Sequence, residues 1–134
     1  MSKLDEAREE FSRDLYATEL SGITIEEVGE DYAKCAMRLT DKHRNAYGGI
    51  MGGAIYTLAD LAFAVASNFG RDMATVSLVG TASFLSMTKG SILYAKTELI
   101  KNGRTNCFYN VRIYDDLGKD IATVSFTGAH IRKS

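Results

Sequence analysis

The stretch 52–69 predicts a long helix that is apolar on nearly every side. Gly70 follows it, at the place where a left-handed residue commonly ends a helix. A helix of this kind must be covered over most of its surface. We expect a curved antiparallel sheet to cover about half of it and a second subunit to cover the rest. The apolar positions are Ala54, Ile55, Leu58, Leu61, Ala62, Phe63, Val65 and Ala66.

Asp60 is the one charged residue within this apolar stretch. A charge at the middle of a bilayer costs about 3 kcal/mol or more, so a buried helix in a soluble protein is a better interpretation than a membrane span. A buried carboxylate is costly unless it is paired or hydrogen-bonded. Such acids are kept either as structural ion pairs or for function, which makes Asp60 the first candidate for a functional site.

Strand patterns lie on both sides of the helix in the sequence. Within 32–40, Ala33, Cys35 and Met37 alternate with polar residues, which is typical of a strand with one buried face. Asn102-Gly103 is a strong hairpin signal, and strands joined by hairpins are antiparallel. The fold class is therefore α+β. The expected strands span 22–28, 32–40, 75–85, 91–101, 104–114 and 121–131, after a short amphipathic helix with Leu4, Ala7, Phe11 and Leu15 on its apolar side.

Length and composition suit one domain, which we place at 1–134. The chain has 16 Lys and Arg against 17 Asp and Glu, without a large basic cluster, which argues against nucleic-acid binding. The first residues are too charged for a signal peptide. Cys35 and Cys107 lie outside any metal-ligand spacing, so we interpret them as buried free thiols in a reducing cytoplasm.

The start of the long helix lacks a residue that can cap it. Met51 precedes Gly52-Gly53 and offers no side-chain oxygen to the unpaired N–H groups of the first turn. These groups and the positive end of the helix dipole are open to a ligand oxygen, unless water or Asn45 occupies them. Asn45 itself either shapes the glycine-rich loop before the helix or contacts a ligand.

The same region resembles a family signature. The runs 45–53 (Asn-Ala-Tyr-Gly-Gly-Ile-Met-Gly-Gly) and 58–60 (Leu-Ala-Asp) resemble that of hotdog-fold thioesterases of the phenylacetate-degradation type. Further similarity lies at 81–85, 103–105, 111, 115–118 and 122–127. The resemblance implies the hotdog fold, in which an antiparallel sheet wraps around a long helix. It also implies cleavage of acyl-CoA thioesters without a metal ion or cofactor, since coenzyme A is part of the substrate.

Carried over position by position, the resemblance implies three roles. Asp60 matches the acidic catalytic residue, Gly53 the N–H that polarises the thioester carbonyl, and Asn45 the loop amide that orients substrate or water. Met51 stands where the family often has a His, so that polarising role is missing. The candidate substrate-binding residues are Gly52, Tyr47, Met51, Tyr56 and Phe84, with Lys89, Lys101 and Arg104 as cations for the phosphates or as ordinary surface charges. His43 and His130 are interpreted as structural.

The spacing of Gly53 and Asp60 predicts a site that spans two subunits. Seven residues of helix cover about 10 Å, so one helix cannot place both groups around one carbonyl. Two antiparallel helices related by a two-fold axis can do so, giving two sites per dimer. We expect a homodimer at least, and a homotetramer as a dimer of dimers.

Three functions follow from these residues. The first is hydrolysis of an acyl- or aryl-CoA thioester, with Asp60 as general base or as nucleophile. The second is non-catalytic binding or sensing of acyl-CoA, which Met51 in place of His favours. The third is a dehydratase, which ranks last because no His is well placed beside a carboxylate.

Overall fold

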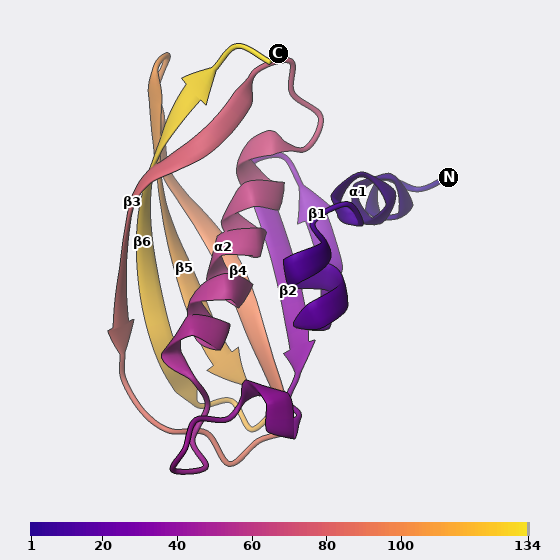
Figure 1. Ribbon diagram of the computed structural model, residues 1–134. Helices are drawn as coiled ribbons and strands as arrows, with labels where there is room; N and C mark the ends of the chain where they lie inside the picture. Colours follow the sequence, from indigo (N-terminus) through magenta and orange to yellow (C-terminus); the bar gives the residue numbers. More distant parts are fainter. Residues whose placement is uncertain (134) are drawn as a thin grey trace.

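One curved sheet and one long helix form the framework of the protein (Figure 1). The computed structural model describes residues 1–133. The helical elements are α1 (Lys3–Phe11), the π-helical segment η1 (Tyr16–Leu20), the 3₁₀ turn η2 (Asp41–His43) and α2 (Gly52–Asn68). The strands are β1 (Ile23–Gly29), β2 (Tyr32–Arg38), β3 (Ala74–Phe84), β4 (Ile92–Asn102), β5 (Asn106–Asp115) and β6 (Asp120–Ile131). All neighbours in the order β1-β2-β4-β5-β6-β3 are antiparallel, which confirms the predicted α+β class.

The bounds of α2 agree with the prediction to within one residue. Met51 precedes it with φ −57° and ψ 131° and gives no side-chain cap, as its chemistry requires. At the other end the Phe69 N–H donates to the Val65 carbonyl at 3.0 Å, and Gly70 takes the left-handed conformation with φ 73°. None of the helices among residues 1–133 is long and apolar enough to cross a membrane.

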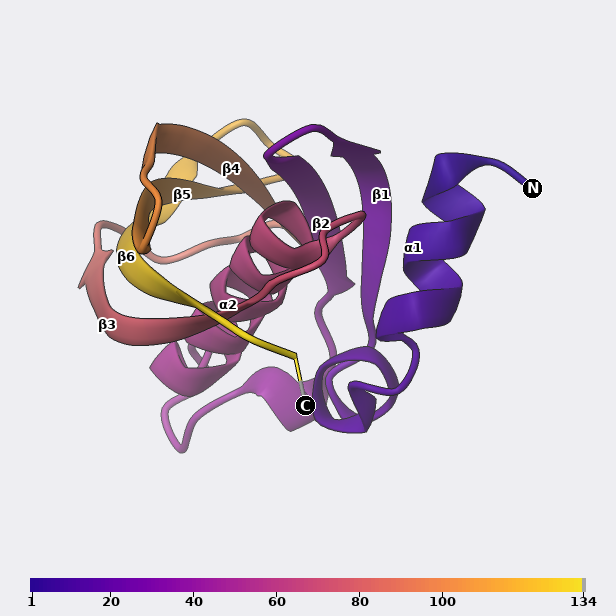
Figure 2. The same ribbon diagram turned by 90° about the horizontal axis from the view of Figure 1, so that it is seen from above.

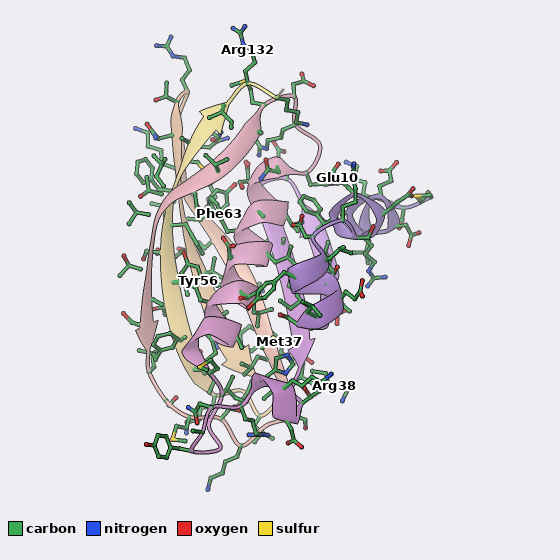
Figure 3. The ribbon with its side chains drawn as sticks, viewed as in Figure 1. Glu10, Met37, Arg38, Tyr56, Phe63 and Arg132 are labelled. Atoms are coloured by element: carbon green, nitrogen blue, oxygen red, sulfur yellow. The ribbon has the colours of Figure 1, made fainter. Side chains whose placement is uncertain are left out.

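The core lies between α2 and the concave face of the sheet, as Figures 1 and 2 show. Phe63 on α2 stacks on Phe126 of β6 at 4.6 Å between ring centroids and meets Tyr109 of β5 edge-on at 5.5 Å. Figure 3 shows Phe63 on the side of α2 that faces the sheet. These aromatic pairs bind the middle strands to the helix.

The sheet curves around α2, and η1 packs against its free side. Nine of the 17 residues of α2 are buried, which agrees with the expected cover over about half of the helix. The buried α2 residues are Ile55, Leu58, Ala59, Leu61, Ala62, Phe63, Val65, Ala66 and Ser67. An accessible stripe remains, formed by Gly53, Thr57, Asp60 and Ala64, which recur at helical spacing along one face.

The N-terminal helix α1 covers one edge of the sheet, beside β1 (Figure 2). It begins with a capping box, in which the Ser2 hydroxyl accepts from the Asp5 N–H at 3.1 Å. Ala7 and Phe11 are buried as predicted. Leu15 is not: it is 58% exposed, because the helix ends at Phe11 and the chain turns before η1.

The opposite edge of the sheet is β3, and no element within residues 1–133 covers it (Figures 1 and 2). This strand is eleven residues long and contains neither proline nor a charged residue. Val76, Leu78 and Val79 are each more than 40% exposed. A long, uncharged edge strand is a ready template for pairing with another strand.

Candidate functional site

The first turn of α2 has unpaired N–H groups. Those of Gly52 and Gly53 have no protein acceptor within residues 1–133, whereas the Ala54 and Ile55 N–H groups both donate to the Met51 carbonyl. The positive end of the helix dipole therefore meets solvent at these two glycines. An oxygen atom of a ligand could accept from them.

Asn45 shapes the loop before α2 instead of capping the helix. Its Oδ1 accepts from the N–H groups of Tyr47 at 2.9 Å and Gly49 at 3.1 Å. The backbone N–H of Asn45 donates to the Gly49 carbonyl at 2.7 Å. The loop-shaping interpretation is thus correct for Oδ1, while Nδ2 has no acceptor among the described residues and is open to a ligand.

A pocket of about 370 Å³ lies beside the start of α2. We call it the loop pocket. Its walls bring together Asn45, Gly52 and Phe84, three predicted site residues from distant parts of the chain. Ring atoms of Phe84 would lie 3.1 Å from a Cβ at Gly52, so only glycine fits there without displacement. The other lining residues are Gly49, Ile50, Ile55, Leu85, Ser86, Met87, Thr88 and Ile121.

Six predicted binding residues do not line this pocket: Tyr47, Met51, Tyr56, Lys89, Lys101 and Arg104. Tyr47 is 97% exposed at the tip of its loop, and the Met51 side chain is 51% exposed. Lys89 belongs to the β3–β4 connection, at the same end of the molecule as the start of α2 (Figure 1). The β4–β5 hairpin that carries Arg104 lies at the opposite end, so the protomer does not bring Arg104 to the loop pocket.

Asp60 is accessible in the protomer, contrary to the expectation that it is buried. It lies on the accessible stripe, where its side chain reaches solvent. None of the ion pairs or side-chain hydrogen bonds found in residues 1–133 involves it, so the structural ion pair that we considered is not formed. Partial burial, and then the negative charge of Asp14, raise the pKa of Asp60. A carboxylate with a raised pKa and no partner is suited to accept a proton.

A second pocket, which we call the acidic pocket, contains Asp60 and has a volume of about 340 Å³. Its other wall is the segment 14–17, which leads into η1, includes its first two residues and packs across the middle of α2. The lining residues are Asp14, Leu15, Tyr16, Ala17, Thr57, Asp60, Leu61 and Ala64. Nothing in the pattern of residues 12–20 indicates that this wall lies beside α2.

The protomer does not bring Gly53 and Asp60 to one place. Gly52 lines the loop pocket and Asp60 lines the acidic pocket, and the two pockets have no lining residue in common. Both groups nevertheless face the same way, because they belong to the accessible stripe. The two groups of the predicted constellation therefore lie at separate places within this chain.

Both histidines hold the fold together, as predicted. His43 is buried, its Nδ1 accepts from the Thr40 N–H at 3.0 Å, and its Nε2 donates to the Ser21 carbonyl at 2.8 Å. These partners assign the proton to Nε2. His130 lies between the Thr75 hydroxyl and the Asn102 amide oxygen, far along the sheet from Asp60.

The two cysteines are not candidates for the reacting group. Cys35 and Cys107 are buried free thiols, as predicted. Burial raises the pKa of Cys35 to about 12 and also raises that of Cys107. A buried thiol with a raised pKa is a poor nucleophile, because the thiolate is the reactive form.

Comparison with known proteins agrees with this fold. Residues 47–122 match the thioesterase superfamily, and the chain belongs to this family. A relative from Archaeoglobus fulgidus is 33% identical over 81% of this chain and 71% of its own length. The acyl-coenzyme A thioesterase PaaI of Escherichia coli is 30% identical over 75% of this chain and 72% of its own length. The solved structure of the E. coli PaaI protein superposes with a TM-score of 0.84, at 24% identity over 98% of both chains, which confirms the hotdog fold.

Proposed function

We propose that this protein is an acyl-CoA thioesterase, which hydrolyses an acyl- or aryl-CoA thioester to a free acid and coenzyme A. One observation carries the proposal: an uncapped helix start at Gly53 and an unpaired carboxylate at Asp60 lie on the same accessible stripe of α2. The first can stabilise an oxyanion and the second can act on water. Membership of the thioesterase superfamily, and the name of the E. coli relative, support acyl-CoA as the substrate class.

We further propose that each site combines Gly53 of one protomer with Asp60 of its partner. The two residues are about 10 Å apart along α2, which is too far for both to act on one thioester carbonyl. A second helix running antiparallel to the first would place its Asp60 near this Gly53. The two-fold axis between them would then create two equal sites per dimer.

The exposed edge of β3 supports such a dimer. If two β3 strands pair antiparallel, the two-fold axis stands perpendicular to the joined sheet. Both α2 helices then lie on the same face of that sheet and run antiparallel, as the shared site requires. The pairing would also cover Val76, Leu78 and Val79, which are exposed in the protomer. A homotetramer would arise from two such dimers.

The proposed reaction needs only water and these groups. The Gly53 N–H stabilises the negative charge on the carbonyl oxygen as the tetrahedral intermediate forms. Asp60 of the partner either takes a proton from the attacking water or attacks the carbonyl itself to form an anhydride. The C–S bond breaks and the coenzyme A thiolate leaves. On the general-base route the thiolate takes up the proton that Asp60 accepted from water. On the anhydride route a water molecule then hydrolyses the anhydride, which releases the free acid, regenerates the Asp60 carboxylate and supplies the proton for the thiolate. The free Nδ2 of Asn45, which lines the loop pocket, would orient the substrate or the water.

We also propose roles in substrate binding for the remaining candidate residues. Gly52 and Phe84 line the loop pocket, and Tyr47 and Met51 stand at its approach, where they would contact bound substrate. Lys89 is at the same end of the molecule and would meet a phosphate, whereas Arg104 would have to act from a partner. Coenzyme A is part of the substrate, and we propose no metal ion or other cofactor. Two buried free thiols support a cytoplasmic location.

The test is a thiol-release assay over short, long and aryl acyl-CoA substrates. Wild-type protein should release free thiol, and Asp60→Asn should not do so above background. Single turnover of one substrate in ¹⁸O-labelled water separates the two mechanisms. Label in the Asp60 carboxylate identifies a nucleophilic Asp60 whose anhydride is opened by water at the Asp60 carbonyl, because a general base sends all of the label into the free acid.

Non-catalytic acyl-CoA binding is the second candidate. The observation that favours it is Met51 at the uncapped helix start, where the family often has a His that can form strong hydrogen bonds. A sensor would bind acyl-CoA saturably and release no thiol. The same assay, combined with calorimetric binding, distinguishes the two functions.

A further inference from the structure

The acidic pocket combines two carboxylates with an otherwise largely apolar wall. Asp14 and Asp60 are the charged residues among those that line it, and the rest are Leu, Ala, Thr and Tyr. Leu15 is 58% exposed and Tyr16 is 67% exposed, although both are large and hydrophobic. Side chains of this kind gain free energy when a ligand covers them, at roughly 25 cal/mol per Å² of apolar surface.

Hydrogen bonds fix the conformation of the segment that carries Leu15 and Tyr16. The Thr18 N–H and hydroxyl both donate to the Asp14 carbonyl, at 2.9 and 3.0 Å. The Ser21 N–H donates to the Tyr16 carbonyl at 3.0 Å, and the His43 ring binds the Ser21 carbonyl at 2.8 Å. Leu15 and Tyr16 are therefore presented by an ordered π-helical turn, not by a free tail.

We propose that the acidic pocket binds the acyl group of the substrate, and that Leu15 and Tyr16 select which acyl groups it takes. This inference rests on the proposed thioesterase function and adds the identity of the acyl subsite. The favoured acyl groups are neutral and apolar, above all those with an aromatic ring that can pack on Tyr16.

The two carboxylates of the acidic pocket disfavour binding of the coenzyme A end of the substrate there. Coenzyme A carries several phosphate charges, and two carboxylates with no lining cation would repel them. The same repulsion acts on an acyl group that ends in a carboxylate. Asp14 lies across the pocket from the helix, so it opposes such a group without needing to take part in the reaction.

The pocket also lies where an acyl chain must go. The thioester carbonyl has to reach Asp60, and the lining residues Leu61 and Ala64 continue along α2 from that point. An acyl chain leaving the carbonyl would run between this part of the helix and the 14–17 segment. The open loop pocket is left for the coenzyme A side of the molecule.

Tyr16→Ala and Leu15→Ala test the apolar wall. We expect the ratio of kcat/KM for benzoyl-CoA to that for acetyl-CoA to fall roughly tenfold or more in Tyr16→Ala, because acetyl cannot reach the ring. Leu20→Ala is the matched control, since Leu20 belongs to the same turn, is 71% exposed and does not line the pocket. An unchanged ratio in both wall variants overturns the proposal.

Asp14→Asn tests the charge. Glutaryl-CoA and pentanoyl-CoA have acyl chains of equal length, and only the first ends in a carboxylate. We expect Asp14→Asn to raise the glutaryl to pentanoyl ratio of kcat/KM several-fold by removing one repulsive charge. An unchanged ratio contradicts the placement of the acyl group beside Asp14.

A binding measurement distinguishes failure of the acyl-subsite proposal from failure of the proposed thioesterase function. S-benzyl-CoA is a thioether that cannot be hydrolysed, and its affinity is compared with that of free coenzyme A by calorimetry. If turnover is absent but Tyr16→Ala weakens S-benzyl-CoA alone, the subsite stands and thioesterase activity does not. If turnover occurs with unchanged acyl ratios, the activity stands and the subsite does not. If neither ligand binds and no turnover occurs, both are overturned.

Discussion

The hydroxyl of Tyr56 on α2 occupies the space where a side chain at Gly80 on β3 would begin. A Cβ at position 80 would also lie 2.9 Å from Cζ of Tyr56 and 3.1 Å from a ring atom of Phe126. Figure 3 shows Tyr56 on the side of α2 toward β3 and β6. The Tyr56 ring also packs on Phe126, with 5.7 Å between the ring centroids.

Gly80→Ala should therefore destabilise the protein by about 1–3 kcal/mol, as overpacking in a filled site does. Tyr56→Phe removes the hydroxyl in conflict, so the double variant should recover a large part of this loss. Denaturant unfolding of the two single variants and the double variant measures the coupling. Strictly additive effects would show that the Tyr56 hydroxyl does not cause the restriction.

Asp60→Asn should lower kcat by about 10²–10⁴-fold, the range for loss of a general base. The fold should remain, and stability at neutral pH should not fall. Burial and Asp14 raise the pKa of Asp60, so the folded state favours the protonated carboxyl. That contribution is complete below the ordinary pKa of Asp and is lost as pH rises through the raised value. Asn stays neutral throughout, so lower thermal stability of Asp60→Asn at pH 7 would contradict this account.

The pH dependence of catalysis should report the raised pKa of Asp60. Activity requires the ionised carboxylate, so the acid limb of kcat/KM should have its midpoint above the ordinary value of about 3.9. Asp14→Asn removes the neighbouring charge and should move this midpoint to lower pH. The midpoint should still exceed the ordinary value, because burial is the larger cause. Asp72→Asn, an exposed change far from the pocket, serves as the control, and equal midpoints in the two variants would refute the role of Asp14.

His43→Ala should lower the free energy of unfolding by about 1–3 kcal/mol, since two backbone groups lose their partners. The His43 ring donates a hydrogen bond to the Ser21 carbonyl and accepts one from the Thr40 N–H. It therefore connects the end of η1 to the loop that leads into α2. Hydrogen exchange at η1 should also accelerate. Full protection of that segment in the variant would mean that other contacts hold it.

Much of the fold could be predicted from periodicity and turn residues alone. The apolar run that became α2, the alternation in β2 and the glycine after Phe69 each reflect local physics that acts within a few residues. The end of α1 was harder, because Leu15 continues the helical spacing while the chain actually turns after Phe11. β5 begins at Asn106, two residues later than expected, because the Gly103 N–H donates to the Asn106 carbonyl within the turn before the strand.

The site was predictable only in part, for a physical reason. Residues on one helix, such as Gly53 and Asp60, keep a fixed spacing that the sequence displays. Tyr16 and Asp14 reach Asp60 through tertiary packing of a segment more than forty residues earlier, and no local pattern records such a contact. The accessibility of Asp60 was also hidden, since the sequence does not show which stripe of an apolar helix the sheet leaves uncovered.

The central claim is that one site uses Gly53 of one protomer and Asp60 of the other. Gly53→Pro removes the relevant N–H, and proline is tolerated in the first turn of a helix. Each variant alone should be folded and nearly inactive, Gly53→Pro by about 10²–10³-fold. Circular dichroism and size-exclusion chromatography of each variant provide the control for fold and assembly.

Co-expression of differently tagged Asp60→Asn and Gly53→Pro chains gives the most direct measurement. In a mixed dimer, one site carries both defects and the other site is intact. Random pairing makes about half of the dimers mixed, so thiol release should return to about one quarter of the wild-type rate. Activity that remains at the level of the separate variants, in a sample shown to contain mixed dimers, would contradict the shared site.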